Sequence, residues 1–262
     1  MGSATTQARA ESGRALDAAS GVDLDVAREL FAAARTLGDT PQLSGALAAA
    51  ATPVAARQKL VTDVFGGFAP TTVSLLSALA AQRWSSSVDL VEGIEEIAVR
   101  AASIAEPGTD IAGELFAVSR TVADNPELEL ALGSRLGEAS AKGTLIEALF
   151  AGRSGAATVL IASSLVRQPR DRRVRAMLTW AKELVAEQRG RIVGTVYSAV
   201  ALSTAQRARL GASLGQRYGG QVELNVVVDP TVVGGLRVEI GDDVIDATVS
   251  SRLGDLRQRL AG

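Results

Sequence analysis

The sequence predicts a mostly helical protein: N-terminal all-α helical bundles with an internal repeat, followed by a small C-terminal α+β domain. Three observations support this fold class. A block of short helical stretches occurs twice in the first two thirds of the 262-residue chain. From about residue 191 apolar residues alternate with polar ones, the pattern of half-buried strands. Hydrophobic residues make up 47% of the chain and charged residues 21%, as in ordinary globular domains.

The composition argues against several classes of function. The chain has no cysteine and no histidine, so it lacks thiolate chemistry, the commonest general base and the commonest zinc ligand. A net charge of −2 gives no basic face for nucleic acid. No apolar run reaches the roughly 18 residues of a membrane span, and no secretory signal is visible. We expect a cytosolic protein with no cofactor and no metal, which reaches a membrane only through partners.

The first 21 residues allow two interpretations. The segment is rich in alanine and polar residues. Ala8, Ser12, Ala15 and Leu16 could line one side of a short amphipathic helix. A frayed terminus is the alternative, because chain ends are often poorly ordered.

An internal repeat decides the architecture of the helical part. Glu29, Leu30, Phe31 and Ala32 recur as Glu114, Leu115, Phe116 and Ala117, an offset of 85 residues. Further pairs at this offset are Arg35 and Arg120, Thr36 and Thr121, Asp39 and Asp124, Pro41 and Pro126, Leu43 and Leu128, Leu47 and Leu132, Leu60 and Leu145, and Phe65 and Phe150. Coincidence between alanine-rich stretches is the alternative, but it does not explain matched prolines, phenylalanines and charges. We interpret the block as a duplicated helical module.

Short helices are expected in each copy. Asp124 and Asn125 before Pro126 predict a helix start with proline at the first position, and Leu128, Leu132 and Leu136 line that helix. Two more helices are expected over residues 139–150 and 155–167. Between the copies an amphipathic helix is expected, with Asp89 and Glu92 as its capping box. A longer helix over residues 171–188, stopped by Gly190, is interpreted as a connection between domains.

The last third is expected to fold as strand, helix, three strands and helix. Residues 191–202 have strand character, and Ser203 with Gln206 forms a capping box for a helix ending at Tyr218. Strands follow near residues 222–228, 236–240 and 244–248, then a closing helix with Val249, Leu253, Leu256 and Leu260 on one face. We predict domains over residues 1–87 (first helical module), 88–190 (second bundle) and 191–262 (α+β domain).

The C-terminal stretch resembles the signature of the delta subunit of the rotary proton-translocating ATP synthase, the oligomycin sensitivity-conferring protein family. The resemblance is carried by Asp229, Pro230, Val232, Val233, Gly234, Gly235, Gly241, Asp242, Val244, Ile245, Asp246, Arg252 and Leu253. Ala247 and Ser251 stand where the family usually has glycine. Residues 88–262 resemble one complete delta subunit, and the earlier copy resembles the added module of an extended form.

The resemblance implies a non-catalytic subunit of the peripheral stalk at the cytoplasmic face of the plasma membrane. It implies that the helical bundle binds N-terminal helices of alpha subunits and that the C-terminal domain holds the C-terminal region of the b subunit. Helix-in-groove binding is the expected mode. Candidate groove residues are Ile94, Ile97, Val159, Leu160 and Ile161, although core residues would show the same spacing.

A run of arginines surrounds the start of the helix expected at residue 171: Arg167, Arg170, Arg172, Arg173 and Arg175. Cations at a helix N-terminus oppose the macrodipole. Arg172 and Arg173 are therefore candidates for docking an acidic partner, and a solvated helix start is the alternative. For Trp84 and Trp180, core anchoring is expected and an interface role is the alternative.

Other interpretations of function stay open at this point. Asp229, Asp242, Asp243 and Asp246 are clustered, but their spacing favours turns over a metal loop. The glycine pair Gly234 and Gly235 favours close backbone packing over phosphate binding, because no helix follows it directly. Two further functions remain: a free-standing helical-repeat adaptor without a role in ATP synthase, and an enzyme that uses carboxylates and arginines alone.

Overall fold

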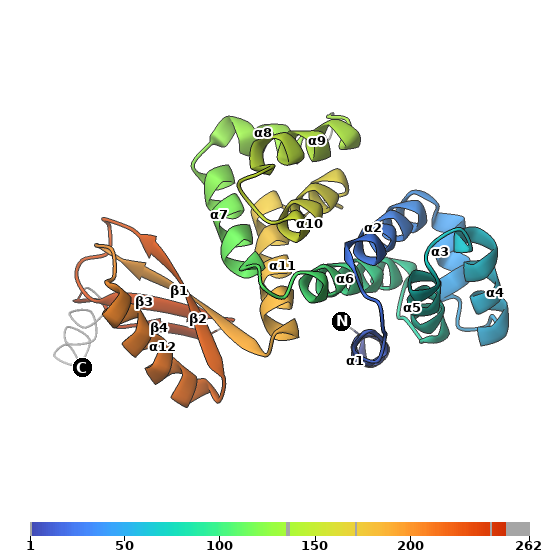
Figure 1. The fold of residues 1–262 in the computed structure, drawn as a ribbon, viewed down its shortest axis with the longest axis horizontal. Helices are drawn as coiled ribbons and strands as arrows, with labels where there is room; N and C mark the ends of the chain where they lie inside the picture. The colour runs from blue at the N-terminus through green and yellow to red at the C-terminus, as the bar shows by residue number, and fades with distance from the viewer. Residues whose placement is uncertain (1, 135–136, 171, 242, 250–262) are drawn as a thin grey trace, which may run out of the picture. The chain divides into compact units, whose positions relative to one another are not determined.

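The computed structural model describes residues 2–134, 137–170, 172–241 and 243–249, which form twelve helices and four strands. The chain divides into two compact units, Met1–Val185 and Ala186–Gly262, and the division falls inside helix α11 (Val174–Gln188). The first unit is all-α, and the second contains a small sheet with one helix (Figure 1). The predicted fold class is therefore confirmed.

Helices fill the first unit. The first six are α1 (Ser3–Asp17), α2 (Leu24–Asp39), α3 (Pro41–Ala48), α4 (Val54–Phe65), α5 (Pro70–Ala81) and α6 (Ser87–Ala105). The next are α7 (Ile111–Ala123), α8 (Pro126–Gly133), α9 (Ala139–Phe150), α10 (Ala156–Arg167) and α11. The N-terminus is helical rather than frayed, because Thr5, Ala8, Ser12 and Leu16 are buried on one face of α1.

The sequence repeat is also a repeat of helices. Helices α3 and α8 both begin at a proline, Pro41 and Pro126, which are 85 residues apart. Helices α4 and α9 both end at a phenylalanine, Phe65 and Phe150, at the same offset of 85 residues. The two copies therefore place their short helices in the same order, as the duplicated sequence predicts.

A glutamate shared by the copies caps a later helix in each. In the first copy, Glu29 Oε2 accepts hydrogen bonds from the N-cap N–H of α5 at 2.9 Å and from the Thr72 hydroxyl at 2.6 Å. In the second copy, Glu114 Oε2 accepts from the N-cap N–H of α10 at 2.8 Å and from the Thr158 hydroxyl. The first N–H groups of a helix lack intrahelical acceptors, so a carboxylate there satisfies donors and complements the dipole.

Helix α6 takes part in both copies. Twelve of its 19 residues are buried. Its core positions correspond to those of α11 at an offset of 87 residues: Leu90, Val91, Ile94, Ile97 and Ala98 match Met177, Leu178, Ala181, Leu184 and Val185, all buried. It thus closes the first copy as α11 closes the second, and it precedes α7 as α1 precedes α2. The predicted modules share this helix, and their boundary at residue 87 stays a prediction.

Several helix starts differ from the expected ones. The capping box of Asp89 and Glu92 is wrong: Ser86 is the N-cap of α6, and its Oγ accepts from the Asp89 N–H at 3.1 Å. Helix α11 begins at Val174 rather than 171, because a turn precedes it in which the Arg172 N–H donates to the Pro169 carbonyl at 2.9 Å. Asn125 precedes α8 without a side-chain capping bond. Leu136 lies outside the described residues.

The second unit is a four-stranded sheet with α12 (Thr204–Tyr218) against it. Its strands are β1 (Arg191–Ser198), β2 (Gln221–Val228), β3 (Leu236–Ile240) and β4 (Asp243–Asp246), in the order β2-β1-β3-β4. Strands β1 and β2 are parallel and are joined through α12, whereas β3 pairs antiparallel with β1 and with β4. The core contains Val196, Leu214, Leu224, Val238 and Ile240. The predicted closing helix lies largely outside the described residues.

The predicted caps of α12 are confirmed. Ser203 and Gln206 form both hydrogen bonds of the predicted capping box of α12. Gly219 ends the helix in the left-handed region, with φ of 74°. A second glycine feature is Gly235, whose φ is 80°, and a Cβ atom built there would lie 2.3 Å from the Ala247 carbonyl oxygen. The backbones before β3 and after β4 can therefore approach each other only if residue 235 has no side chain.

The capping glutamate yields a stability prediction. Glu114→Ala leaves the Thr158 hydroxyl and a helix N–H without their acceptor, so the free energy of unfolding of the first unit should fall by about 1–3 kcal/mol. Urea unfolding followed by fluorescence of Trp84 and Trp180 measures it. The control is Asp63→Ala, which removes only an exposed pair with a lysine and should change stability by less than about 1 kcal/mol. Equal effects of both changes would contradict the capping role.

The close approach at Gly235 yields a second prediction. Gly241→Ala should destabilise the second unit by about 1–2 kcal/mol, since φ is 55° there but a Cβ atom would meet nothing within 4 Å. Gly235→Ala should cost more, because steric overlap with the backbone at Ala247 adds to the same dihedral cost. Amide hydrogen exchange in β1 to β3 measures the difference. Similar losses of protection in the two variants would show that the overlap relaxes without cost.

Candidate functional site: partner-binding surfaces

The signature residues of the second unit mainly shape turns. Asp229 Oδ1 accepts from the Thr231 hydroxyl at 2.7 Å and from its N–H at 2.9 Å, and these bonds lower the pKa of Asp229. The Thr248 N–H donates to Asp246 Oδ1 at 2.9 Å, which lowers the pKa of Asp246 in the same way. Pro230 follows within the first of these turns. Both carboxylates therefore hold backbone geometry.

The glycines of the signature lie in the left-handed region, with φ of 65° at Gly234, 80° at Gly235 and 55° at Gly241. They allow the turns that flank β3 and β4, as close backbone packing requires. Arg252 and Leu253 lie outside the part of the chain that the structure describes. Within the described ranges no group of three or more carboxylates is placed to hold a metal ion. No helix described here has the length and hydropathy needed to cross a bilayer.

The candidate groove residues divide into core and surface. Ile94, Ile97 and Ile161 are only 2%, 1% and 0% exposed, so the first-unit core holds them and they offer no free surface. Helical spacing alone could not separate the two cases, because core and groove residues share it. Val159 and Leu160 on α10 are half-buried and pack against that core from outside. These two remain candidates for binding a partner helix.

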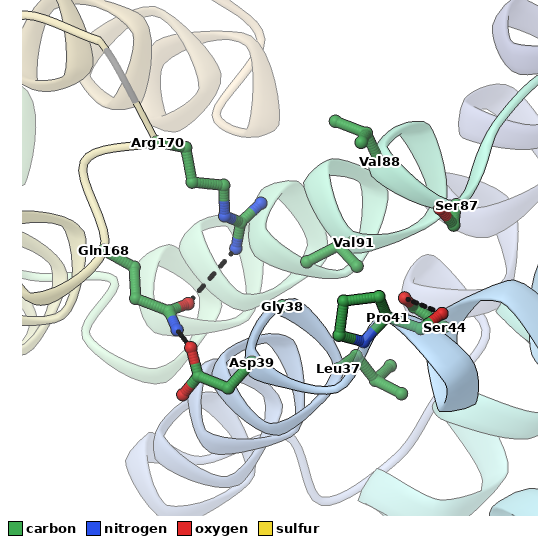
Figure 2. Close-up of a pocket in the computed structure, with 10 residues that line it drawn as sticks. All are labelled: Leu37, Gly38, Asp39, Pro41, Ser44, Ser87, Val88, Val91, Gln168 and Arg170. Carbon is green, nitrogen blue, oxygen red and sulfur yellow. Dashed lines mark hydrogen bonds between the residues drawn. The ribbon is translucent and has the colours of Figure 1, made fainter.

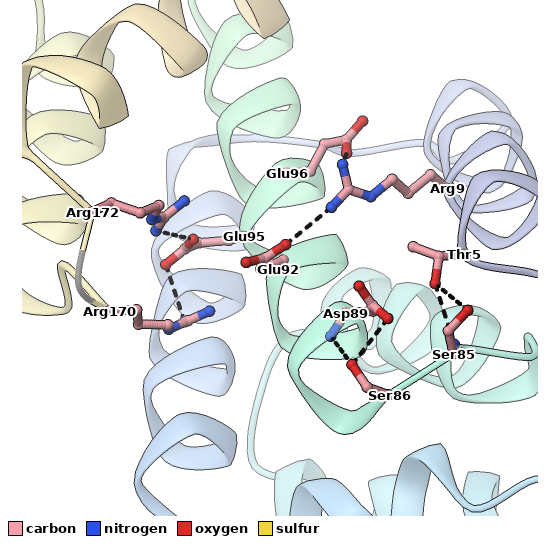
Figure 3. Close-up of polar contacts among 10 residues, drawn as sticks. All are labelled: Thr5, Arg9, Ser85, Ser86, Asp89, Glu92, Glu95, Glu96, Arg170 and Arg172. Carbon is pink, nitrogen blue, oxygen red and sulfur yellow. Dashed lines mark hydrogen bonds and ion pairs between the residues drawn. The ribbon is translucent and has the colours of Figure 1, made fainter. Parts of the chain in front are cut away.

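Most of the arginine run is already paired inside the first unit. Glu95 on α6, whose side chain is 4% exposed, accepts from Arg170 at 3.1 Å and from Arg172 at 2.7 Å (Figure 3). Arg172 also lies over the ring of Trp180, 5.3 Å from its centroid. Burial lowers the pKa of Arg170, and the Glu95 charge partly offsets this effect. Arg172 is therefore a structural residue of the free subunit.

The remaining arginines differ in their exposure to partners. Arg167 pairs with Glu147 at 2.7 Å, and Arg175 pairs with Glu129 at 3.0 Å. Arg173 is exposed just before α11. It lines a cavity of about 540 Å³ to which Lys142, Arg167, Arg170 and Arg172 also contribute. The start of α11 is thus strongly cationic, and among the cations that line this cavity Arg173 is the exposed one.

A further cavity was not anticipated from the sequence. It has a volume of about 320 Å³ and lies between the end of α2, the starts of α3 and α6 and the loop after α10 (Figure 2). Its lining residues are Leu37, Gly38, Asp39, Pro41, Ser44, Ser87, Val88, Val91, Gln168 and Arg170. No local motif marks it, because three distant segments contribute. Trp84, by contrast, is a core residue as expected, and its indole N–H donates to the Leu79 carbonyl at 2.9 Å.

Comparison with known proteins finds relatives that share one name and one family. A family model described as "ATP synthase delta (OSCP) subunit" matches residues 98–260. The chain is 46% identical to "ATP synthase subunit delta" of Leifsonia xyli subsp. xyli over 264 residues, which covers all of both chains. It is 39% identical to the protein of that name from Streptomyces griseus subsp. griseus over 271 residues, again covering both chains fully. It is 38% identical to that from Nocardia farcinica, over 98% of this chain and 97% of the relative.

A solved structure is also similar, but weakly. A chain of the "Cryo-EM structure of Toxoplasma gondii mitochondrial ATP synthase hexamer, composite model" has a TM-score of 0.39 and 21% identity, covering 64% of this chain and 97% of that chain. A TM-score of 0.39 is too low to support a comparison of the two folds. The family match and the full-length identities, together with the turn signature around Gly235, show that the chain belongs to the ATP synthase delta (OSCP) subunit family.

Proposed function

We propose that this protein is a non-catalytic subunit of the peripheral stalk of ATP synthase. In this role it links the catalytic head to the b-subunit stalk, so that proton flow remains coupled to ATP synthesis. The observation that carries the proposal is 46% identity to a protein named ATP synthase subunit delta over the whole of both chains. The relatives compared above all bear that name, and none of them favours a free-standing adaptor.

The mechanical task sets the kind of binding required. The rotor turns against the head, so a stator must hold the head through contacts that resist displacement. A helix-in-groove contact can do this, because an amphipathic helix buries apolar area that must be re-exposed when the contact slips. Val159 and Leu160 on α10 provide a half-buried aliphatic surface of this kind. We assign the N-terminal helices of alpha subunits to the helical unit, through this surface.

The C-terminal unit is assigned to the C-terminal region of the b subunit. The complex then lies at the cytoplasmic face of the plasma membrane, with this chain as a peripheral component. An enzymatic role finds little support in the geometry. Asp229, which is half-buried, and Asp246, which is exposed, have lowered pKa values and line neither cavity described above. A catalytic carboxylate would instead be expected in a pocket, with a pKa raised by burial or by a neighbouring charge.

Co-purification tests the proposed function directly. A tagged full-length chain should purify with the intact ATP synthase, and cross-links should map α10 to alpha subunits and the second unit to the b subunit. Membranes from cells without this chain should hydrolyse ATP without pumping protons. A tagged chain that purifies alone, or membranes that stay coupled without it, would rule out the stalk role.

Leu160 should separate partner binding from folding. Leu160→Asp places a charge in the expected helix-binding surface and should weaken binding to the isolated catalytic head by about 10-fold or more. The free subunit should still fold, with a lower unfolding midpoint, because Leu160 is half-buried and packs only against the outside of the core. The matched variant Ile161→Asp should lose the fold, since residue 161 is fully buried and a carboxylate there has no partner. Loss of the fold in both variants would place Leu160 in the core.

Arg173 tests the cationic surface at the start of α11. Arg173→Gln should weaken association with the ATP synthase at low salt and should reduce its dependence on ionic strength, because an exposed charge acts through screened attraction. The control is Arg153→Gln, another exposed arginine of the second copy that does not line this cavity. Binding titrations between about 20 and 200 mM salt span the range in which screening changes strongly. Parallel salt curves for the wild type and both variants would show that Arg173 has no role in docking.

A further inference from the structure

The cavity of about 320 Å³ in the first copy has an apolar side that continues onto the surface. Leu37 and Val91 are buried and form its floor, whereas Pro41 and Val88 are exposed at its rim. Val88 is 58% exposed, more than most valines of a folded domain. Figure 2 shows these apolar residues at one end and Asp39, Gln168 and Arg170 at the other. A small ligand bound inside the cavity would not cover this exposed apolar rim.

The polar end of this cavity has an unused hydrogen-bond donor. Arg170 Nη2 donates to Glu95 at 3.1 Å and to Gln168 Oε1 at 3.4 Å. Its Nη1 is buried and has no acceptor among the residues that the structure describes. Glu95 already forms ion pairs with two guanidinium groups, those of Arg170 and Arg172. The Arg170 backbone is also held in the left-handed region, with φ of 46°, a conformation that is unfavourable for a non-glycine residue and is often found at binding sites.

The second copy differs from the first in the charge of the equivalent place. At the position of Ser44, offset by 85 residues, the second copy has Glu129, and at the position of Val88, offset by 87, it has Arg175. Glu129 and Arg175 form an ion pair of 3.0 Å between α8 and α11. In the first copy the equivalent residues are a serine and an exposed valine. The first copy therefore has a cavity with an apolar rim where its duplicate has a charged pair beside a cationic cavity.

We propose that this cavity docks an amphipathic helix from another subunit of the ATP synthase. The helix inserts an aliphatic side chain between Val88, Pro41 and Leu37, and it places a carboxylate within reach of Arg170. Charge complementarity favours the carboxylate, because Arg170 shares the one carboxylate of Glu95 with Arg172 and its Nη1 has no acceptor among the described residues. The proposal rests on the stalk function, and it adds a contact in the first copy that is separate from α10.

A matched pair of valines tests this docking site. Val88→Asp removes apolar rim surface and places a negative charge where a carboxylate is expected, so full-length chain should bind ATP synthase stripped of this subunit at least 10-fold more weakly. Val54→Asp is the control: Val54 is also exposed, at 42%, also lies in the first turn of a helix and does not line the cavity. An aspartate in a first helical turn is favourable in either case, so both variants should keep the fold. Equal affinities of the two variants would overturn the proposal.

The outcome distinguishes this proposal from the stalk function itself. If the wild-type chain does not bind the stripped complex, the stalk function fails. If it binds and Val88→Asp binds as tightly, only the docking site fails.

A photo-reactive residue in place of Val88 identifies the occupant in the reconstituted complex. The expected cross-link joins a segment of another ATP synthase subunit that has apolar residues at helical spacing and an aspartate or glutamate beside them. A cross-link to a second copy of this chain, to a segment without an acidic residue, or to nothing in the complex would overturn the proposal. The same residue in place of Val54 should give no such product.

Discussion

The packing of one helix into two copies of a module constrains the whole first unit. Helix α6 buries most of its residues, and its apolar positions have the same order as those of α11. A helix that is apolar on several sides must be covered by several neighbours. The first copy covers α6 through α1, α2, α3 and α5, and the second contacts it through α10. Each copy would expose apolar surface of α6 if the other were absent.

The acidic residues of α6 also pair with arginines of the elements that cover this helix. Glu92 and Glu96 form ion pairs with Arg9 of α1 at 3.2 and 3.5 Å, and Glu95 accepts from the loop after α10 (Figure 3). Acidic side chains on a buried helix need partners, because an unpaired charge in a core is strongly destabilising. One helix thus attaches the N-terminal helix on one side and the end of the second copy on the other. Arg172 is consequently less available to partners than its place in the arginine run indicates.

Much of the fold could be predicted from the sequence, because the relevant signals are local. The repeated Glu29 and Glu114 mark real caps, and Ser203 with Gln206 forms the capping box that its spacing indicates. The start of α6 was misplaced because both Ser86 and Asp89 can cap a helix. Ile94 and Leu160 have the same helical periodicity, so only the folded structure separates core from surface. The cavity at Val88 could not be predicted, since it depends on how segments more than a hundred residues apart meet.

The shared helix also bears on how a stator responds to load. When two domains are joined by a flexible linker, pulling one of them first extends the linker. Force reaches the other domain only after the linker is straight. Here the copies are joined by a continuous helix of 19 residues that is part of the one core they share. Displacing one copy therefore strains side-chain packing in the other from the outset. Duplication on a common helix therefore joins the two copies without adding a compliant joint between them.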